Sequence, residues 1–263
     1  MVSMNLARVT ATAGPPSPIT RLAEPLLIEG ALEPGLAESW SLAELDRQYG
    51  ALPVFVALDG RPTPDRDGSR SNEIRTLADY VRWLERADSE PRYVMHTFFL
   101  EENRARVQTA VERCRRSGAF VPDLPFHDSA ECMAKDLDFL EDYIREPQLF
   151  RFYLGPEGTG ALPHRHELAV NALTHGTKRW VVYRSVTKAA AEVERAAHRD
   201  YGAGSLARDW FEEQAGSLAQ RDGLEVWEFE QRAGDLLVIP GGLMHATLNL
   251  TPVTGLIAQE LYW

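Results

Sequence analysis

Three histidines in this sequence have the spacing of ligands for a metal ion. His164 and His166 lie two residues apart, and side chains two apart in an extended strand point to the same face, whereas Glu167 would point away. His245 follows about 80 residues later, behind the turn-forming residues 240–242, as a distant strand does when a barrel closes. Three nitrogen ligands, or two with one carboxylate, on one side of a cation leave positions open for further ligands. Non-haem Fe(II) oxygenases use this arrangement.

Glu167 is the alternative third ligand. A carboxylate often joins two histidines at such a site. Strand alternation directs Glu167 away from His164, so a local bulge would be needed to turn it inward. The sequence leaves both ligand sets open, one with His166 and one with Glu167. We expect the isolated His96 and the turn residue His175 to be core, surface or rim residues.

The elements that must position these histidines are short strands. From Phe150 onward, apolar stretches alternate with Gly and Pro turns, which is typical of a small barrel over 150–263. The Ala-, Glu- and Arg-rich insertion at 185–220 predicts two helices around Tyr201–Gly204 at the barrel rim. The strands are predicted over 150–154, 162–167, 169–174, 178–184, 225–232, 235–239, 243–249 and 254–262.

The part before the barrel predicts α/β elements that pack on it. The segment 1–24 is rich in small residues and proline, which predicts a flexible tail. Within 25–149, a helix begins with Ser41 as its N-cap and Glu44 three residues on. We also expect a short entry strand before this helix, strands over 54–58 and 93–100, a charged loop over 63–73, and helices over 74–86, 101–116 and 137–144.

Composition limits the expected partners. The chain has 263 residues, of which 39 are acidic and 28 basic, and the net charge of −11 disfavours sequence-independent binding to nucleic acid or anionic lipid. No apolar run approaches the roughly 18 residues of a membrane span, and no secretory signal pattern opens the chain, so we expect a cytoplasmic protein. Cys114 and Cys132 are expected to be reduced thiols.

Two stretches resemble the motifs of the cupin superfamily. Gly158, five residues and then His164 to His166 resemble the opening of the first motif, and the run from Gly234 to Asn249 has the spacing of the whole second motif. Within the cupins, residues 171–180 and 240–250 are similar to the JmjC oxygenases, in particular the small ones that hydroxylate protein side chains. The resemblance spans roughly residues 25–260. It implies a mainly β fold with flanking helices, built on a double-stranded β-helix, which is the cupin or jelly-roll barrel.

The resemblance also implies Fe(II) as the metal and 2-oxoglutarate as a cosubstrate. JmjC relatives carry Asp or Glu where this chain has His166. In relatives with a Gly-x-Lys-Arg-Trp run, the lysine, Lys178 here, pairs with the distal carboxylate of 2-oxoglutarate, and Asn171 lies beside it. An inward ammonium in an apolar barrel requires an anion, which a dicarboxylate supplies. The alternative is a lysine exposed at the rim.

Four further residues are candidates for the cosubstrate site. Asn249 could hydrogen-bond the cosubstrate or a ligand histidine, or make a backbone contact at the barrel end. Gln259 stands on the last barrel strand, where relatives place polar residues against 2-oxoglutarate, although Ala258 departs from that pattern. Tyr153 and Thr159 are candidates for the pocket wall.

The expected function is hydroxylation of a peptide or protein side chain, or of a small metabolite, coupled to decarboxylation of 2-oxoglutarate. One alternative is a cupin metalloenzyme with a three-histidine site that does not use 2-oxoglutarate. The other is a non-catalytic JmjC-like binding protein. The family also suggests a homodimer.

Overall fold

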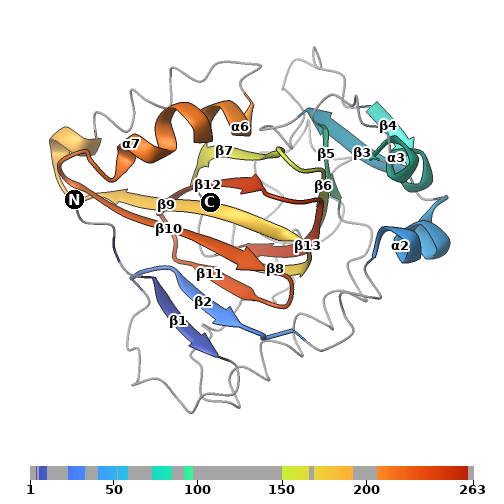
Figure 1. Ribbon diagram of the computed structural model, residues 1–263, viewed down its shortest axis with the longest axis horizontal. Helices are drawn as coiled ribbons and strands as arrows, with labels where there is room; N and C mark the ends of the chain where they lie inside the picture. Colours follow the sequence, from blue (N-terminus) through green and yellow to red (C-terminus); the bar gives the residue numbers. More distant parts are fainter. Residues whose placement is uncertain are drawn as a thin grey trace, which may run out of the picture.

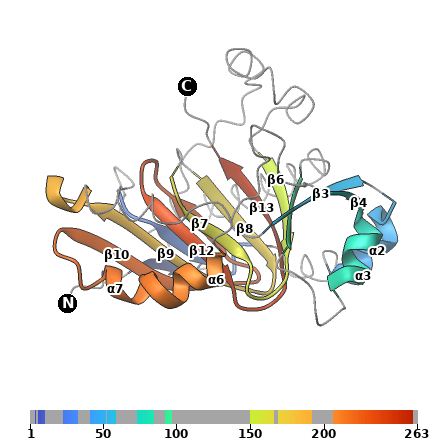
Figure 2. The ribbon, with the colours of Figure 1, turned by 90° about the horizontal axis from the view of Figure 1, so that it is seen from above.

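The described chain forms two β-sheets that lie against each other as layers (Figures 1 and 2). The computed structural model describes residue 4 and residues 6–10, 23–32, 41–51, 53–58, 73–84, 92–96, 150–165, 169–191 and 206–259. One sheet has nine strands in the order β1-β2-β11-β8-β13-β6-β5-β3-β4, and the other has four in the order β10-β9-β12-β7.

Eight strands of the C-terminal part make the barrel and pass repeatedly between the two sheets. The nine-stranded sheet takes β6 (Phe150–Gly155), β8 (Ala169–His175), β11 (Leu236–Ile239) and β13 (Val253–Gln259). The four-stranded sheet takes β7 (Gly160–His164), β9 (Thr177–Ser185), β10 (Leu224–Arg232) and β12 (Met244–Asn249). Neighbouring barrel strands pair antiparallel. This is the predicted double-stranded β-helix, and the strand boundaries differ from the predicted ones by a few residues.

Strand alternation decides which side chains fill the barrel. Along β9, Trp180 and Val182 join the interior cluster, whereas Val181 and Tyr183 face the opposite side. The interior cluster also holds apolar residues of β10, β2 and β11, so it joins the two sheets. Burial of this apolar surface is the main stabilising contribution. The members of the cluster are Leu27, Trp180, Val182, Trp227, Phe229, Leu237, Ile239 and Leu243.

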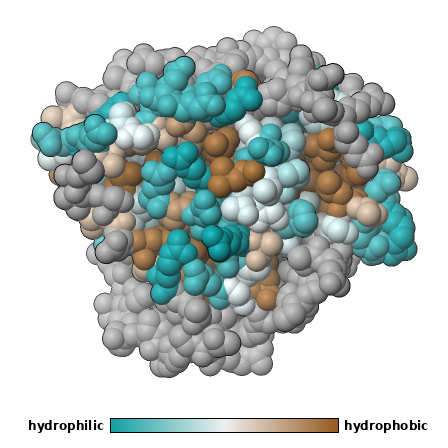
Figure 3. Space-filling view, in the orientation of Figure 1, coloured by the Kyte–Doolittle hydropathy of each residue, from teal (hydrophilic) through white to brown (hydrophobic). Residues whose placement is uncertain are grey.

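A helical segment covers the outer face of the four-stranded sheet. It consists of α6 (Ala207–Trp210), a π-helical turn η2 (Phe211–Ala215) and α7 (Gly216–Leu218). Trp210 and Phe211 pack against Val181 and Tyr183 of β9 in a second apolar cluster. The outward surface of the segment is hydrophilic (Figure 3). The segment lies in the C-terminal part of the insertion for which helices were predicted, and Tyr201–Gly204 lies outside the described residues.

The N-terminal elements extend the nine-stranded sheet at both ends. Strand β2 (Leu26–Glu29) pairs with β11, and β5 (Arg92–His96), β3 (Pro53–Leu58) and β4 (Glu73–Thr76) follow beyond β6. Helices α2 (Leu42–Tyr49) and α3 (Leu77–Leu84) pack on each other beside them. Ser41 is the N-cap of α2, as predicted, and its Oγ accepts a bond of 3.4 Å from the Glu44 N–H.

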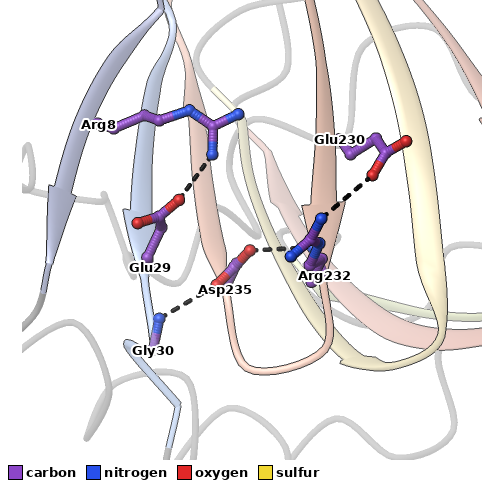
Figure 4. A network of polar contacts seen from close by, with 6 residues as sticks. All are labelled: Arg8, Glu29, Gly30, Glu230, Arg232 and Asp235. Carbon is purple, nitrogen blue, oxygen red and sulfur yellow. Dashed lines mark hydrogen bonds and ion pairs between the residues drawn. The ribbon is translucent and has the colours of Figure 1, made fainter.

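The prediction of a flexible tail over residues 1–24 is wrong for Ala7–Thr10. These residues form β1, which pairs parallel with β2. Polar contacts hold the two strands and the β10–β11 turn together (Figure 4). Arg8 contacts Glu29 at 2.6 Å, and the Asp235 carboxylate accepts from the Gly30 N–H at 3.1 Å and the Arg232 N–H at 2.9 Å. These non-local contacts cannot be read from local composition.

The predicted helix over 74–86 begins later than expected. Residues 73–76 form β4 instead, because they pair with Pro53–Val56 of β3. Thr76 then caps the helix, since its Oγ1 accepts from the Asp79 N–H at 3.1 Å. Several predictions lie outside the described residues: the loop over 63–72, the end of the 93–100 strand, the helices over 101–116 and 137–144, and both cysteines. None of the helices in the described part is long and apolar enough to span a membrane.

Candidate functional site

His164 and His245 come together at adjacent positions of the four-stranded sheet. They are register partners in the antiparallel pairing of β7 with β12. Their imidazole centroids are 4.2 Å apart, with an angle of 60° between the ring planes. His245 is only 2% exposed. The two rings are therefore close enough for both to bind one ion.

The backbone fixes which nitrogen of each ring faces a metal. His164 Nδ1 lies 2.8 Å from the carbonyl oxygen of Leu162, and His245 Nδ1 lies 3.1 Å from that of Leu243. A carbonyl can only accept, so each Nδ1 carries the hydrogen and each Nε2 carries the lone pair. Metal-binding histidines are commonly oriented in this way, and the donor chemistry fits a divalent transition metal.

The third predicted ligand is not part of the described chain. Strand β7 ends at His164, and residues 166–168, which include His166 and Glu167, lie outside the described residues. Within the described ranges, no group of three His, Cys, Asp or Glu side chains is close enough to hold a metal ion. The choice between His166 and Glu167 stays a prediction.

Lys178 is buried inside the barrel, so the alternative of a lysine exposed at the rim is wrong. Lys178 is only 2% exposed. It lies on β9 as the register partner of Asn249 on β12. Its Nζ lies 4.1 Å from the ring centroid of Tyr153 and 5.6 Å from that of Trp180, and it donates a long bond of 3.5 Å to the Tyr93 hydroxyl. Burial lowers the pKa of Lys178 to about 7, because removal from water disfavours the ammonium.

Asn171 is connected to Lys178 through Tyr153, which contacts both residues. The Tyr153 hydroxyl donates to Asn171 Oδ1 at 2.8 Å. Burial raises the pKa of Tyr153 well above its ordinary value, so the phenol keeps its proton and acts as the donor. Asn171 Nδ2 is buried and makes no hydrogen bond within the described part of the structure. A buried N–H donor and a buried ammonium, both beside Tyr153, fit a carboxylate ligand.

Asn249 and Thr159 stabilise the turn that leads into β7. Asn249 Nδ2 donates to Thr159 Oγ1 at 2.9 Å and to the Pro156 carbonyl at 3.3 Å. Backbone bonds between Asn249 and residues 158 and 159 reinforce this contact. Asn249 thus makes the barrel-end contact that was one of its two predicted roles. Thr159 is fully buried and donates to the Pro156 carbonyl, so its hydroxyl also serves the turn.

Three candidates remain, of which one lies at the barrel rim and two have side chains outside the described residues. His175 is exposed at the end of β8, as predicted for a rim residue. The backbones of His96 and Gln259 lie in β5 and β13, and their side chains are outside the described residues.

Three residues of the site were not predicted. Tyr93 of β5 and Trp180 of β9 form walls around the Lys178 ammonium, at 5.9 and 5.6 Å from their ring centroids. The Trp180 ring also lies 6.2 Å from that of His245, so it stands between the two ends of the site. Gln231 of β10 is fully buried and is the register partner of Lys178. The alternation of β10, in which Trp227, Phe229 and Gln231 are buried, was a usable signal.

Comparison with known proteins finds one family model that matches part of the chain. Residues 151–254 match a family model described as "JmjC domain, hydroxylase". No curated protein matches the chain significantly. The matched range begins in β6 and ends in β13, and it contains the histidine pair and the Lys178 end of the site.

Proposed function

We propose that this protein is an Fe(II)- and 2-oxoglutarate-dependent oxygenase that hydroxylates its substrate, because residues 151–254 match the JmjC domain model. The observation that carries the proposal is the burial of Lys178 without any carboxylate partner in the described structure. A buried ammonium is costly unless an anion compensates it. A dicarboxylate cosubstrate provides that anion, and the histidine pair provides the metal.

The proposed metal ligands are His164, His245 and a third residue, which is His166 or Glu167. Iron bound there would supply the oxidative chemistry that couples decarboxylation of 2-oxoglutarate to succinate with hydroxylation of a C–H bond. Two or three protein ligands on one side of the ion leave room for a chelating 2-oxoacid.

The other proposed roles belong to the interior of the barrel. The ammonium of Lys178 and the Asn171 amide bind the distal carboxylate, because both are buried donors beside Tyr153. Trp180 and the apolar interior cluster exclude water around them. Electrostatic contacts are stronger in such a dry site than in water.

The test is an anaerobic titration of metal-free protein, first with Fe(II) and then with 2-oxoglutarate. An iron-chelated 2-oxoacid gives a weak visible charge-transfer band. We expect this band in the wild-type protein, its loss in His245→Ala, and a much weaker affinity for 2-oxoglutarate in Lys178→Met. Lys188→Met, which changes an exposed lysine of the same chain, is the matched control and should behave as wild type.

One observation favours a second candidate. The position of the family's carboxylate ligand is occupied by His166, as in cupins with three-histidine sites. If Fe(II) binds and no band follows 2-oxoglutarate, the protein is a three-histidine metalloenzyme that does not use this cosubstrate. If neither binds, the barrel is a non-catalytic binding module. The substrate of the lead proposal is a peptide side chain or a small metabolite, and succinate release is the assay to search for it.

A further inference from the structure

Gln231 makes hydrogen bonds to both sheets from inside the barrel. Its Oε1 accepts from the Trp180 indole N–H at 3.0 Å. Its Nε2 donates to the carbonyl oxygens of Asn171 at 2.9 Å and Asp235 at 3.2 Å. Trp180 belongs to the four-stranded sheet, whereas Asn171 lies on β8 of the nine-stranded sheet. This single amide therefore joins the two layers at the level of Lys178, its register partner.

The orientation of the Gln231 amide is fixed by its partners. An indole N–H can only donate, and a carbonyl can only accept. Exchanging the amide oxygen and nitrogen would place N–H against N–H and oxygen against two carbonyl oxygens. With zero exposure, the side chain has no water to compensate such a reversal. Gln231 thus holds Trp180 and the Asn171 backbone in one relative position.

Both residues that Gln231 holds line the site. The Trp180 ring lies 5.6 Å from Lys178 Nζ and 6.2 Å from the His245 ring. The Asn171 side chain accepts from Tyr153, over whose ring the Lys178 ammonium lies, and its Nδ2 makes no hydrogen bond in the described structure. A shift of β8 relative to β9 would therefore separate the Asn171 amide from the ammonium.

We propose that Gln231 is a positioning residue for the carboxylate-binding end of the cosubstrate site, acting through Trp180 and Asn171. The inference rests on the proposed use of 2-oxoglutarate. Gln231 need not touch the cosubstrate, since it sets the distance between the donors that do. Preorganised donors bind an anion more tightly than donors that must first be ordered.

The first test compares Gln231→Leu with Thr174→Val. Thr174 is a matched control because it is also buried and also links two barrel strands, its hydroxyl donating to the Thr254 carbonyl at 2.9 Å. Both variants are expected to lower the melting temperature, since each removes buried hydrogen bonds. In the anaerobic band titration, only Gln231→Leu should weaken 2-oxoglutarate binding, by about tenfold. The affinity for Fe(II) alone should change by less than about twofold in both variants.

A second measurement reads the positioning without any cosubstrate. In ¹⁵N-labelled, metal-free protein, the indole N–H signal of Trp180, assigned by its loss in Trp180→Phe, should shift and exchange faster in Gln231→Leu. Gln231→Met removes the acceptor and both donated bonds with a side chain of similar length and no charge. It should therefore shift the Trp180 signal and weaken 2-oxoglutarate binding as Gln231→Leu does. This variant also decides the question if Gln231→Leu does not fold.

The outcomes separate the inference from the function on which it rests. If wild-type protein gives no band with 2-oxoglutarate, the proposed function fails, and the inference fails with it. If wild type gives the band and the folded Gln231 variants bind 2-oxoglutarate as tightly as Thr174→Val, the inference alone is overturned, and Gln231 only stabilises the fold.

Discussion

At the scale of single residues, Lys178 combines a cost to the fold with a use in binding. Its ammonium has aromatic rings and one long bond to a phenol around it, and the described residues offer it no carboxylate. Contacts with ring faces recover part of the lost hydration. A buried lysine without a carboxylate partner is therefore better explained by ligand binding than by a contribution to stability.

This view of Lys178 predicts that Lys178→Met stabilises the protein while it weakens 2-oxoglutarate binding. Replacing a buried, uncompensated ammonium with an apolar side chain of similar volume should raise the free energy of unfolding by about 1–3 kcal/mol. Thermal unfolding of metal-free protein, with Lys188→Met as control, measures the change. A lower melting temperature would mean that an anionic group of the folded protein already pairs with Lys178.

The same lysine predicts that 2-oxoglutarate binding takes up protons. The pKa of Lys178 is lowered to about 7, so near neutral pH the empty site holds both the amine and the ammonium. A bound dianion favours the ammonium and raises this pKa, and the neighbouring Tyr153 phenol, whose pKa is raised by burial, stays protonated in this range. Affinity should therefore fall as the pH rises above 7.

Calorimetry in two buffers of different ionisation enthalpy measures this uptake. We expect roughly half a proton per cosubstrate at pH 7 and almost none at pH 5, where the lysine is already charged. Equal uptake at both pH values would assign the proton to another group.

At the scale of elements, β13 must carry a glycine where it passes Tyr153. A Cβ on Gly255 would lie 2.2 Å from the Tyr153 hydroxyl oxygen and 2.6 Å from the Ala172 carbonyl oxygen. Because Ala172 is backbone of the adjacent strand β8, the contact cannot be relieved by a side-chain rotation alone.

Gly255→Ala is therefore expected to destabilise the barrel by about 1–3 kcal/mol and to displace Tyr153 from Asn171. Chemical denaturation measures the first effect, and the band titration with 2-oxoglutarate measures the second. Gly216→Ala is the control, since a Cβ there meets nothing within 4 Å. If Gly255→Ala binds 2-oxoglutarate as wild type does, the Tyr153 position is not needed for the site.

At the scale of the whole molecule, the sequence predicted the strands of the barrel better than the contacts between residues far apart in the chain. Gly and Pro turns and alternating strands are local signals, and they placed all eight barrel strands. The pairing of β1 with β2 depends on contacts between distant residues, such as those of Asp235, and no local pattern reports them. The same holds for Gln231: alternation indicates that it faces inward, but its partner Asn171 is 60 residues away.

In the candidate site, too, the residues within local sequence motifs were predicted, whereas those brought together only by the fold were not. The family motifs predicted His164, His245 and Lys178, because each lies within a run of fixed spacing. Asn249 had two predicted roles, and only the fold could show that its amide serves the turn at Thr159. Tyr93 belongs to a strand outside the motifs, and its position beside Lys178 results from the pairing of β5 with β6.

The pairing of His164 with His245 also has a consequence for the order of assembly. The two residues are separated by about 80 residues of chain, and bringing them together carries the entropy cost of closing that loop. In the unfolded chain the site does not exist, so an ion that binds both histidines selects molecules in which β7 already lies beside β12. Once bound, it acts as a cross-link between early and late strands of the barrel, and loss of the ion would lower the barrier to their separation.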